Sequence, residues 1–424
     1  MTATADRYRC TRLENGVRVV SLDMPQVATC SVGIWVDVGA RYEPVELNGV
    51  AHLVEHMAFK GTARRSAQAI AEEIEDVGGQ LNAYTSREHT AFYARVLAED
   101  LPLAVDLLAD IVRHARIDAD ELDRERAVVL QEIGQVLDTP DDWVFDLWQD
   151  TAYPNQPLGR SILGPATTVE RLARDDVLRY LATHYAPDRL VVAAAGRVDH
   201  ERVTELAGEH LGDLAHRAAP PMPAAVYRGG HRLEAEEGEQ LHLVLGVEGV
   251  AYEDPDFYAA QVLATALGGG MSSRLFQEVR ERRGLAYNVF AFSASYVDTG
   301  LLGMYAAAAP VDAASLLDVL DATSRALADA PREAEVARAR AQLKASLLMG
   351  LESSTAVCED LARQQLIFDD YLAPATIAAR IDAVDAAAVA RVGRRLLARP
   401  VPSLCALGPL TPALERAAGH ALAA

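Results

Sequence analysis

The stretch Asn48–Phe59, NGVAHLVEHMAF, decides how the rest of the sequence is interpreted. Apart from His52, Glu55 and His56, every residue from position 50 to position 59 is apolar, which is typical of a buried helix. Ionisable side chains on such a helix need partners, because burying them unpaired costs several kcal/mol. His52 and His56 are four residues apart and therefore share one helix face, which Glu55 flanks. This arrangement suits a single bound metal ion.

The order H-x-x-E-H is the inverzincin pattern of zinc peptidases. Taken alone, it leaves open a second interpretation, in which two core histidines are hydrogen-bonded to neighbouring backbone and carboxylate groups. A catalytic zinc site needs a third protein ligand and one open position for water. The sequence must therefore supply another ligand elsewhere.

A helix is predicted over residues 118–137, where Asp118 and Glu121 form a capping box. Its inward positions, at alternating spacings of three and four, are Leu122, Glu125, Val129, Glu132 and Val136. Two glutamates thus occupy positions that are normally apolar. A metal ion in the core is a partner that would explain them.

Composition limits the function classes. The 424 residues include 40 Lys plus Arg and 61 Asp plus Glu, a formal net charge of −21. Such a surface repels phosphate, so nucleic acid and anionic membranes are not expected as partners. Four scattered cysteines form no C-x-x-C pair, and no stretch of about 18 consecutive apolar residues occurs. We expect a cytoplasmic protein without disulfides.

The chain divides at a Pro/Ala/Gly-rich linker, residues 216–230, into domains 1–215 and 231–424. Three matches at offsets of 209 to 214 residues suggest that these domains are duplicates. They pair Asp176 with Asp385, Gly196 with Gly408, and Glu121–Ala127 with Glu335–Ala341.

Local patterns predict a mixed structure. Strands are expected at Ser31–Val38, Thr90–Leu97 and Leu241–Val247, and a helix at Ser66–Val77 with Ser66 as its N-cap. Residues 81–97 read as an antiparallel hairpin. The predicted fold class is α+β, with two homologous sheet-plus-helix domains.

With the flanking text HMAFKGT and a glutamate 76 residues after His56, the sequence resembles the pitrilysin/insulysin and mitochondrial-processing-peptidase family of zinc metallopeptidases. The resemblance implies that His52, His56 and Glu132 bind one Zn²⁺ per chain, with Glu55 as the general base. It also implies that Glu125 supports the site from behind the ligands.

Two further segments match the family. Gly79–Thr85 resembles its substrate-binding edge strand, which would place Asn82 and Ala83 beside an extended peptide. In the second half, Arg280 and Tyr287 match the pair implied to hold the substrate backbone and the oxyanion.

The duplication leaves the second domain without metal ligands, since the positions of His52 and His56 fall in an apolar segment. In the family, four such domains form a chamber, so we expect a homodimer. The expected function is a zinc-dependent endopeptidase, including the processing-peptidase kind, acting on short or unfolded peptides. The alternatives are a catalytically silent structural subunit and one half of a heterodimeric peptidase.

Overall fold

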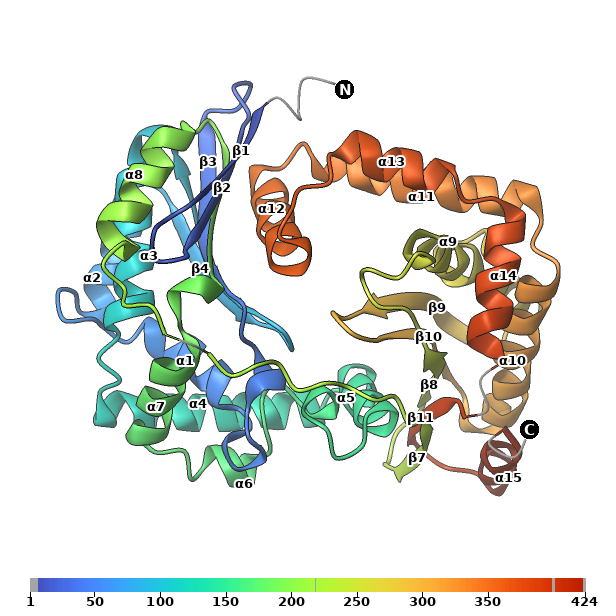
Figure 1. Cartoon of the computed structure of the whole chain (residues 1–424). Helices are drawn as coiled ribbons and strands as arrows, with labels where there is room; N and C mark the ends of the chain where they lie inside the picture. Colours follow the sequence, from blue (N-terminus) through green and yellow to red (C-terminus); the bar gives the residue numbers. More distant parts are fainter. Residues whose placement is uncertain (1–6, 218, 399–400, 422–424) are drawn as a thin grey trace. The chain divides into compact units, whose positions relative to one another are not determined.

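The computed structural model describes residues 7–217, 219–398 and 401–421, which form two compact units (Figure 1). Unit 1 consists of Met1–Gly134, Ser161–Pro223 and Leu348–Ala375. Unit 2 consists of Gln135–Arg160, Ala224–Leu347 and Thr376–Ala424.

Unit 1 is built on a six-stranded mixed sheet in which β4 is an edge strand. In spatial order the strands are β1 (Tyr8–Arg12), β2 (Arg18–Asp23), β6 (Leu190–Gly196), β3 (Thr29–Val36), β5 (Thr90–Leu97) and β4 (Gln80–Thr85). Only β2 and β6 run parallel; the other neighbours are antiparallel.

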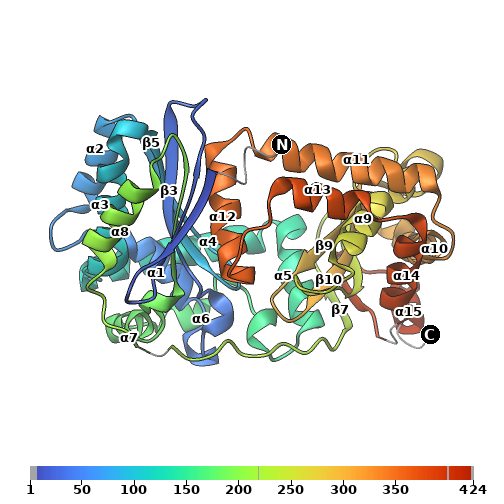
Figure 2. The ribbon, with the colours of Figure 1, turned by 45° about the horizontal axis from the view of Figure 1, so that its top comes forward.

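Helices cover both faces of this sheet, because its strands carry apolar side chains on both sides. The helices are α1 (Val50–Ala58), α2 (Ala67–Asp76), α3 (Leu101–His114), α4 (Ala119–Leu137), α6 (Ala166–Val169), α7 (Arg174–His184), α8 (His200–Leu211) and α12 (Ser354–Phe368). Figures 1 and 2 both place α3 and α8 on one face and α12 on the other.

Unit 2 repeats this plan with five strands. In spatial order they are β7 (Gly230–Ala235), β11 (Ser403–Gly408), β8 (Leu241–Glu248), β10 (Gly300–Ala308) and β9 (Ala286–Ser295). Its helices are α5 (Pro140–Ala152), α9 (Phe257–Gly268), the π-helix η7 (Phe276–Arg282), α10 (Ala313–Asp329), α11 (Glu333–Gly350), α13 (Pro374–Asp382), α14 (Ala386–Leu397) and α15 (Pro412–Ala421). Single 3-10 turns connect several elements: η2 (Ala40–Tyr42), η3 (Val45–Leu47), η4 (Ala98–Asp100), η5 (Pro157–Gly159), η6 (Pro187–Arg189) and η8 (Pro310–Asp312).

The order β2-β6-β3-β5-β4 of unit 1 matches β7-β11-β8-β10-β9 of unit 2, including the single parallel pair. Gly196 and Gly408 end the equivalent strands β6 and β11, both with positive φ, 116° and 133°. A Cβ at either would lie within 2.6 Å of a neighbouring carbonyl oxygen, so both positions require glycine. The α+β class with two sheet-plus-helix domains is confirmed.

One match of the duplication is out of register. Asp385 is the N-cap of α14 and accepts a hydrogen bond from Ala388 N, whereas Asp176 is the third residue of α7 and accepts from Ala173 N. Both carboxylates satisfy amides at a helix start, one turn apart. This explains why the two aspartates are 209 residues apart in sequence, whereas the two equivalent glycines are 212 apart.

The compact units are not continuous sequence blocks. Residues 135–160, with α5, pack on the sheet of unit 2, and residues 348–375, with α12, pack on the sheet of unit 1. The predicted domains 1–215 and 231–424 are continuous, so they assign residues 135–160 and 348–375 to the other half of the chain. Within the predicted linker 216–230, residue 218 lies outside the described residues and the chain passes between units at Pro223.

Local predictions agree closely with the elements. β3, β5 and β8 occupy the predicted strand segments, and β4 pairs with β5 as the expected hairpin. Ser66 caps α2 by accepting a hydrogen bond from Ala69 N at 3.1 Å. None of the helices in the described ranges is both long and apolar enough to cross a membrane.

Candidate metal centre

Helix α1 is fixed at its start by a buried carboxylate. Glu43, 2% exposed, accepts hydrogen bonds from Gly49 N at 2.8 Å, Ala51 N at 2.7 Å and Asn48 Nδ2 at 2.7 Å. A negative group here satisfies free helix amides and interacts favourably with the helix dipole. Gly49 adopts φ 99°, which a residue with a side chain rarely does. No local sequence pattern points to this role of Glu43.

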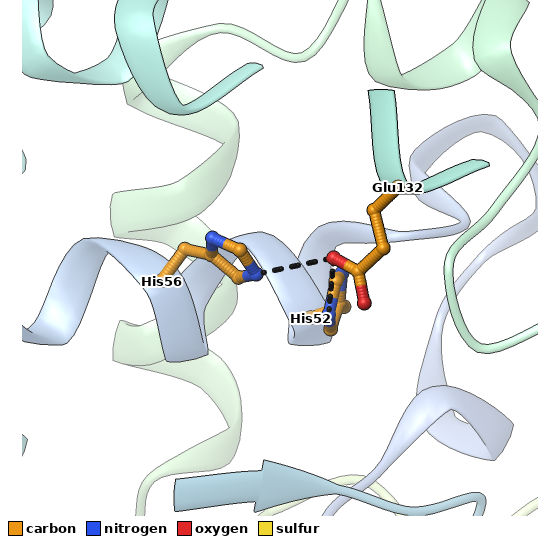
Figure 3. Close-up of side chains that lie close together, drawn as sticks. All are labelled: His52, His56 and Glu132. Atoms are coloured by element: carbon orange, nitrogen blue, oxygen red, sulfur yellow. Dashed lines mark ion pairs between the residues drawn. The ribbon is translucent and has the colours of Figure 1, made fainter. Parts of the chain in front are cut away.

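His52 and His56 project from α1 towards Glu132 on α4 (Figure 3). The Nε2 atoms of both histidines lie 3.6 Å from Glu132 Oε2, and the three potential ligand atoms all lie within 4.8 Å of one another. Zinc–ligand bonds of about 2.0–2.1 Å in a tetrahedral site place neighbouring ligand atoms about 3.3 Å apart. The donor set and its spacing therefore fit a zinc ion.

A carboxylate and an amine orient His56 from behind. Glu125 Oε2 lies 3.0 Å from His56 Nδ1, and Lys60 Nζ lies 2.7 Å from Glu125 Oε1. An ionised carboxylate only accepts, so His56 Nδ1 carries the proton and Nε2 keeps its lone pair for a metal. Glu125 is only 6% exposed, so the ion pair with Lys60 compensates for the burial of its charge.

His52 is neutral at physiological pH. Burial and, to a smaller extent, the neighbouring His56 together lower the pKa of His52 to about 4. A neutral imidazole is the form that binds a metal. Among the described residues, His52 Nδ1 has no hydrogen-bond partner.

Glu55 lies on the same helix and is held by the edge strand. Thr85 Oγ1 donates to Glu55 Oε2 at 2.6 Å. Burial raises the pKa of Glu55, while hydrogen bonds from Thr85 and the nearby His56 oppose the shift. A carboxyl group with a raised pKa is suited to accept and return a proton.

The predicted substrate strand is β4, and its outer side is unpaired among the described residues. Ala83 is 9% exposed, and its N–H donates to Oδ1 of the exposed Asn82 at 2.8 Å. The edge amide of Ala83 is therefore capped by its neighbour's side chain. A peptide that pairs with Ala83 must displace Asn82.

Arg280 and Tyr287 lie together in unit 2. The guanidinium carbon of Arg280, on η7, lies 4.1 Å from the ring centre of Tyr287 at the start of β9, and 4.9 Å from that of Phe276. Tyr287 is 75% exposed. A cation–π contact thus orients an arginine beside an available phenol.

The structure brings together His52, His56 and Glu132, with Glu55 on the same helix and Glu125 behind His56. Lys60 and Thr85 have no expected role in the sequence motifs. Thr85 follows Ala83 by two residues, so strand periodicity places it on the same face as Ala83, whereas Lys60 lies beyond the end of α1 at Ala58, where helix periodicity no longer applies.

Comparison with known proteins agrees with this geometry. The profile of Insulinase (Peptidase family M16) matches residues 18–166, and that of the Peptidase M16 inactive domain matches residues 171–343. Mitochondrial-processing peptidase subunit beta of Mus musculus is 41% identical over 413 residues, covering 94% of this chain and 84% of its own length. An uncharacterized zinc protease of Streptomyces coelicolor is also 41% identical, covering 95% of this chain and 90% of its own length.

Solved structures share the fold. A protease from Helicobacter pylori superposes with a TM-score of 0.88 at 23% identity, covering 95% of this chain and 99% of that chain. A chain of Complex III2 from Candida albicans gives a TM-score of 0.86 at 24% identity, covering 97% of this chain and 99% of that chain. By profile, by identity and by fold, this chain belongs to the insulinase family of peptidases, M16.

Proposed function

We propose that this chain is a zinc-dependent endopeptidase that hydrolyses short or unfolded peptides. The observation that carries the proposal is the convergence of His52 Nε2, His56 Nε2 and Glu132 Oε2 on one point. The names of its relatives as processing peptidase and zinc protease support the same function. One zinc ion per chain is proposed.

His52, His56 and Glu132 would hold the zinc ion, which would supply a Lewis acid for the peptide carbonyl and for water. Glu55 takes the proton of the attacking water at its carboxylate and returns it to the leaving nitrogen. Glu125 holds the proton of His56 at Nδ1, which keeps the imidazole oriented.

Substrate binding is assigned to the edge strand and to unit 2. An extended peptide adds to β4 beside Asn82 and Ala83, with backbone hydrogen bonds that do not depend on sequence. Arg280 and Tyr287 hold the substrate backbone and stabilise the developing oxyanion. The substrates are therefore peptides that can become extended.

We further propose that the chain works as a homodimer whose four domains enclose the substrate. Both the metal-binding motif and the Arg280/Tyr287 motif are present in one chain, so two copies supply everything that the proposal needs. The mass of one chain is 45.7 kDa, and light scattering is expected to give twice that mass. A fully active monomer would contradict the dimer.

The deciding experiment combines metal analysis with cleavage of a peptide library, with and without a chelator. We expect one zinc per chain, cleavage of short peptides, loss of cleavage on chelation and recovery on adding zinc. Folded proteins are expected to be spared. A protein that binds no zinc and cuts no peptide would instead favour a catalytically silent structural subunit.

A further inference from the structure

Strand β4 and the base Glu55 are joined by one residue. Thr85 is the last residue of β4, and its hydroxyl donates to Glu55 Oε2 at 2.6 Å. Hydrogen bonds to an ionised acceptor are short and about twice as strong as neutral ones.

The pleat of β4 puts Thr85 on the side of the sheet that faces α1. Side chains alternate along a strand, so Ala83 and Thr85 share a face and Tyr84 points the other way. Tyr84 does so: its hydroxyl donates to Glu359 on α12 at 3.2 Å. The contact of Thr85 with Glu55 is therefore built into the register of the strand.

The same register aims backbone groups at the free edge. In an antiparallel pair, alternate residues bond to the partner strand or point away from it. Ala83 N–H donates to the Asn82 side chain and so points away from β5, and the alternation along the strand turns the N–H of Thr85, two residues further on, the same way. The edge available to a peptide thus ends at the residue that holds Glu55.

We propose that Thr85 is a positioning residue that ties Glu55 to β4, so that a peptide paired with this strand meets a general base already in its reacting orientation. This inference rests on the proposed peptidase function. The hydroxyl carries the role, because the β-branched shape of Thr85 would be kept by valine.

The variants that test it are Thr85→Val, which removes only the hydroxyl, and Thr85→Ser, which keeps it. Thr183→Val is the matched control, since its hydroxyl donates to Arg179 O within its own helix, α7. Each is compared with the wild type on the library peptide that the wild type cleaves fastest.

We expect Thr85→Val to lower kcat about 10- to 100-fold with KM within about twofold. Thr85→Ser and Thr183→Val should stay within about threefold of the wild type. Zinc content should be unchanged in all three. A wild-type kcat in Thr85→Val, an equal loss in Thr85→Ser, or a loss that lies in KM or in zinc would overturn the inference.

A measurement without turnover separates this inference from the proposed function. The ¹³C signal of the Glu55 carboxyl carbon, assigned by its disappearance in Glu55→Gln, should shift in Thr85→Val and not in Thr85→Ser. A signal that does not move in Thr85→Val would refute the link to Glu55, whether or not the wild type cleaves peptides. A wild type that contains zinc and cuts nothing, with the signal shifted as expected, would refute only the proposed function.

Discussion

The two units share a strand order but differ on two pairs of helices. In unit 1, α1 carries His52, Glu55 and His56, whereas the corresponding helix α9 of unit 2, FYAAQVLATALG, has no charged residue or histidine. On the long helices, Glu132 of α4 aligns with Ser346 of α11. In the part of unit 2 that the structure describes, no comparable group of metal-binding side chains occurs.

Unit 2 shows that the fold forms without these ionisable residues. Unit 2 forms the same sheet with an apolar α9 packed against β9. Because burying imidazole and carboxylate groups costs free energy, those in unit 1 need compensation, either from protein partners or from a bound ligand. Substitutions at equivalent positions of the two units test this difference.

The largest effect is expected from removing the charge of the proposed general base on α1, Glu55. Glu55→Gln leaves a side chain of the same shape that cannot take a proton, so cleavage should fall about 10³-fold or more. Zinc content should stay at the wild-type level. Peptide cleavage by a verified zinc-loaded sample checks this, with Glu201→Gln on the exposed side of α8 as control. Full activity in Glu55→Gln would sink the mechanism.

The next effect compares equivalent positions of the long helices. Glu132→Ala removes one of three ligands and should weaken zinc binding at least about 10²-fold, with activity lost at limiting zinc. Ser346→Ala, its counterpart in unit 2, should change neither. Competition with a zinc-binding dye measures both affinities. Equal zinc binding by both variants would show that the ion is held elsewhere.

A third test concerns a feature that the units have in common. Each has a buried carboxylate bound by two arginines: Asp110 by Arg64 and Arg65, and Glu335 by Arg274 and Arg332. Asp110→Asn and Glu335→Gln should each destabilise the protein by about 2 kcal/mol, because a buried charge pair is broken. Urea denaturation measures the loss, and zinc content should not change.

The pH dependence of this loss has a definite sign. Burial alone would raise the pKa of Asp110, but hydrogen bonds from Thr62, Arg65 and Arg64 outweigh it and hold the pKa below the usual range. The hydrogen bonds of Arg274 do the same for Glu335. A lowered pKa stabilises the protein above the ordinary carboxyl pKa of about 4, and the benefit is lost as pH falls below it. The destabilisation should therefore be full at pH 7 and shrink towards pH 3; the same loss at both would contradict it.

The smallest effect is expected at Lys60. Lys60→Met keeps a side chain of similar length but removes the ammonium group, whose Nζ lies 2.7 Å from Glu125 Oε1. Zinc affinity should therefore fall about tenfold. Lys344→Met in unit 2, which breaks the 2.6 Å pair with Asp382, is the matched control and should leave zinc affinity unchanged. An unchanged affinity in Lys60→Met would remove Lys60 from the support of the site.

Much of the site was predictable because it lies on regular elements. The four-residue spacing of His52 and His56 fixes their common face. The predicted stripe of α4 places Glu125 inside and Glu132, whose side chain is 42% exposed, at the edge that faces the histidines. Thr85 and Lys60 were not predictable, because their importance depends on partners 30 and 65 residues away in sequence. Nothing in the local pattern names those partners.

The α+β class, the hairpin of β4 and β5, and the candidate metal ligands follow from the sequence, because periodicity and helix capping act over a few residues. Tertiary structure alone decided the exchange of α5 and α12 between the halves, the capping of α1 by Glu43 and the contact of Thr85 with Glu55. These features depend on which apolar faces pack together and on which buried polar groups find partners. Neither can be inferred from local sequence, because the partners lie far apart along the chain.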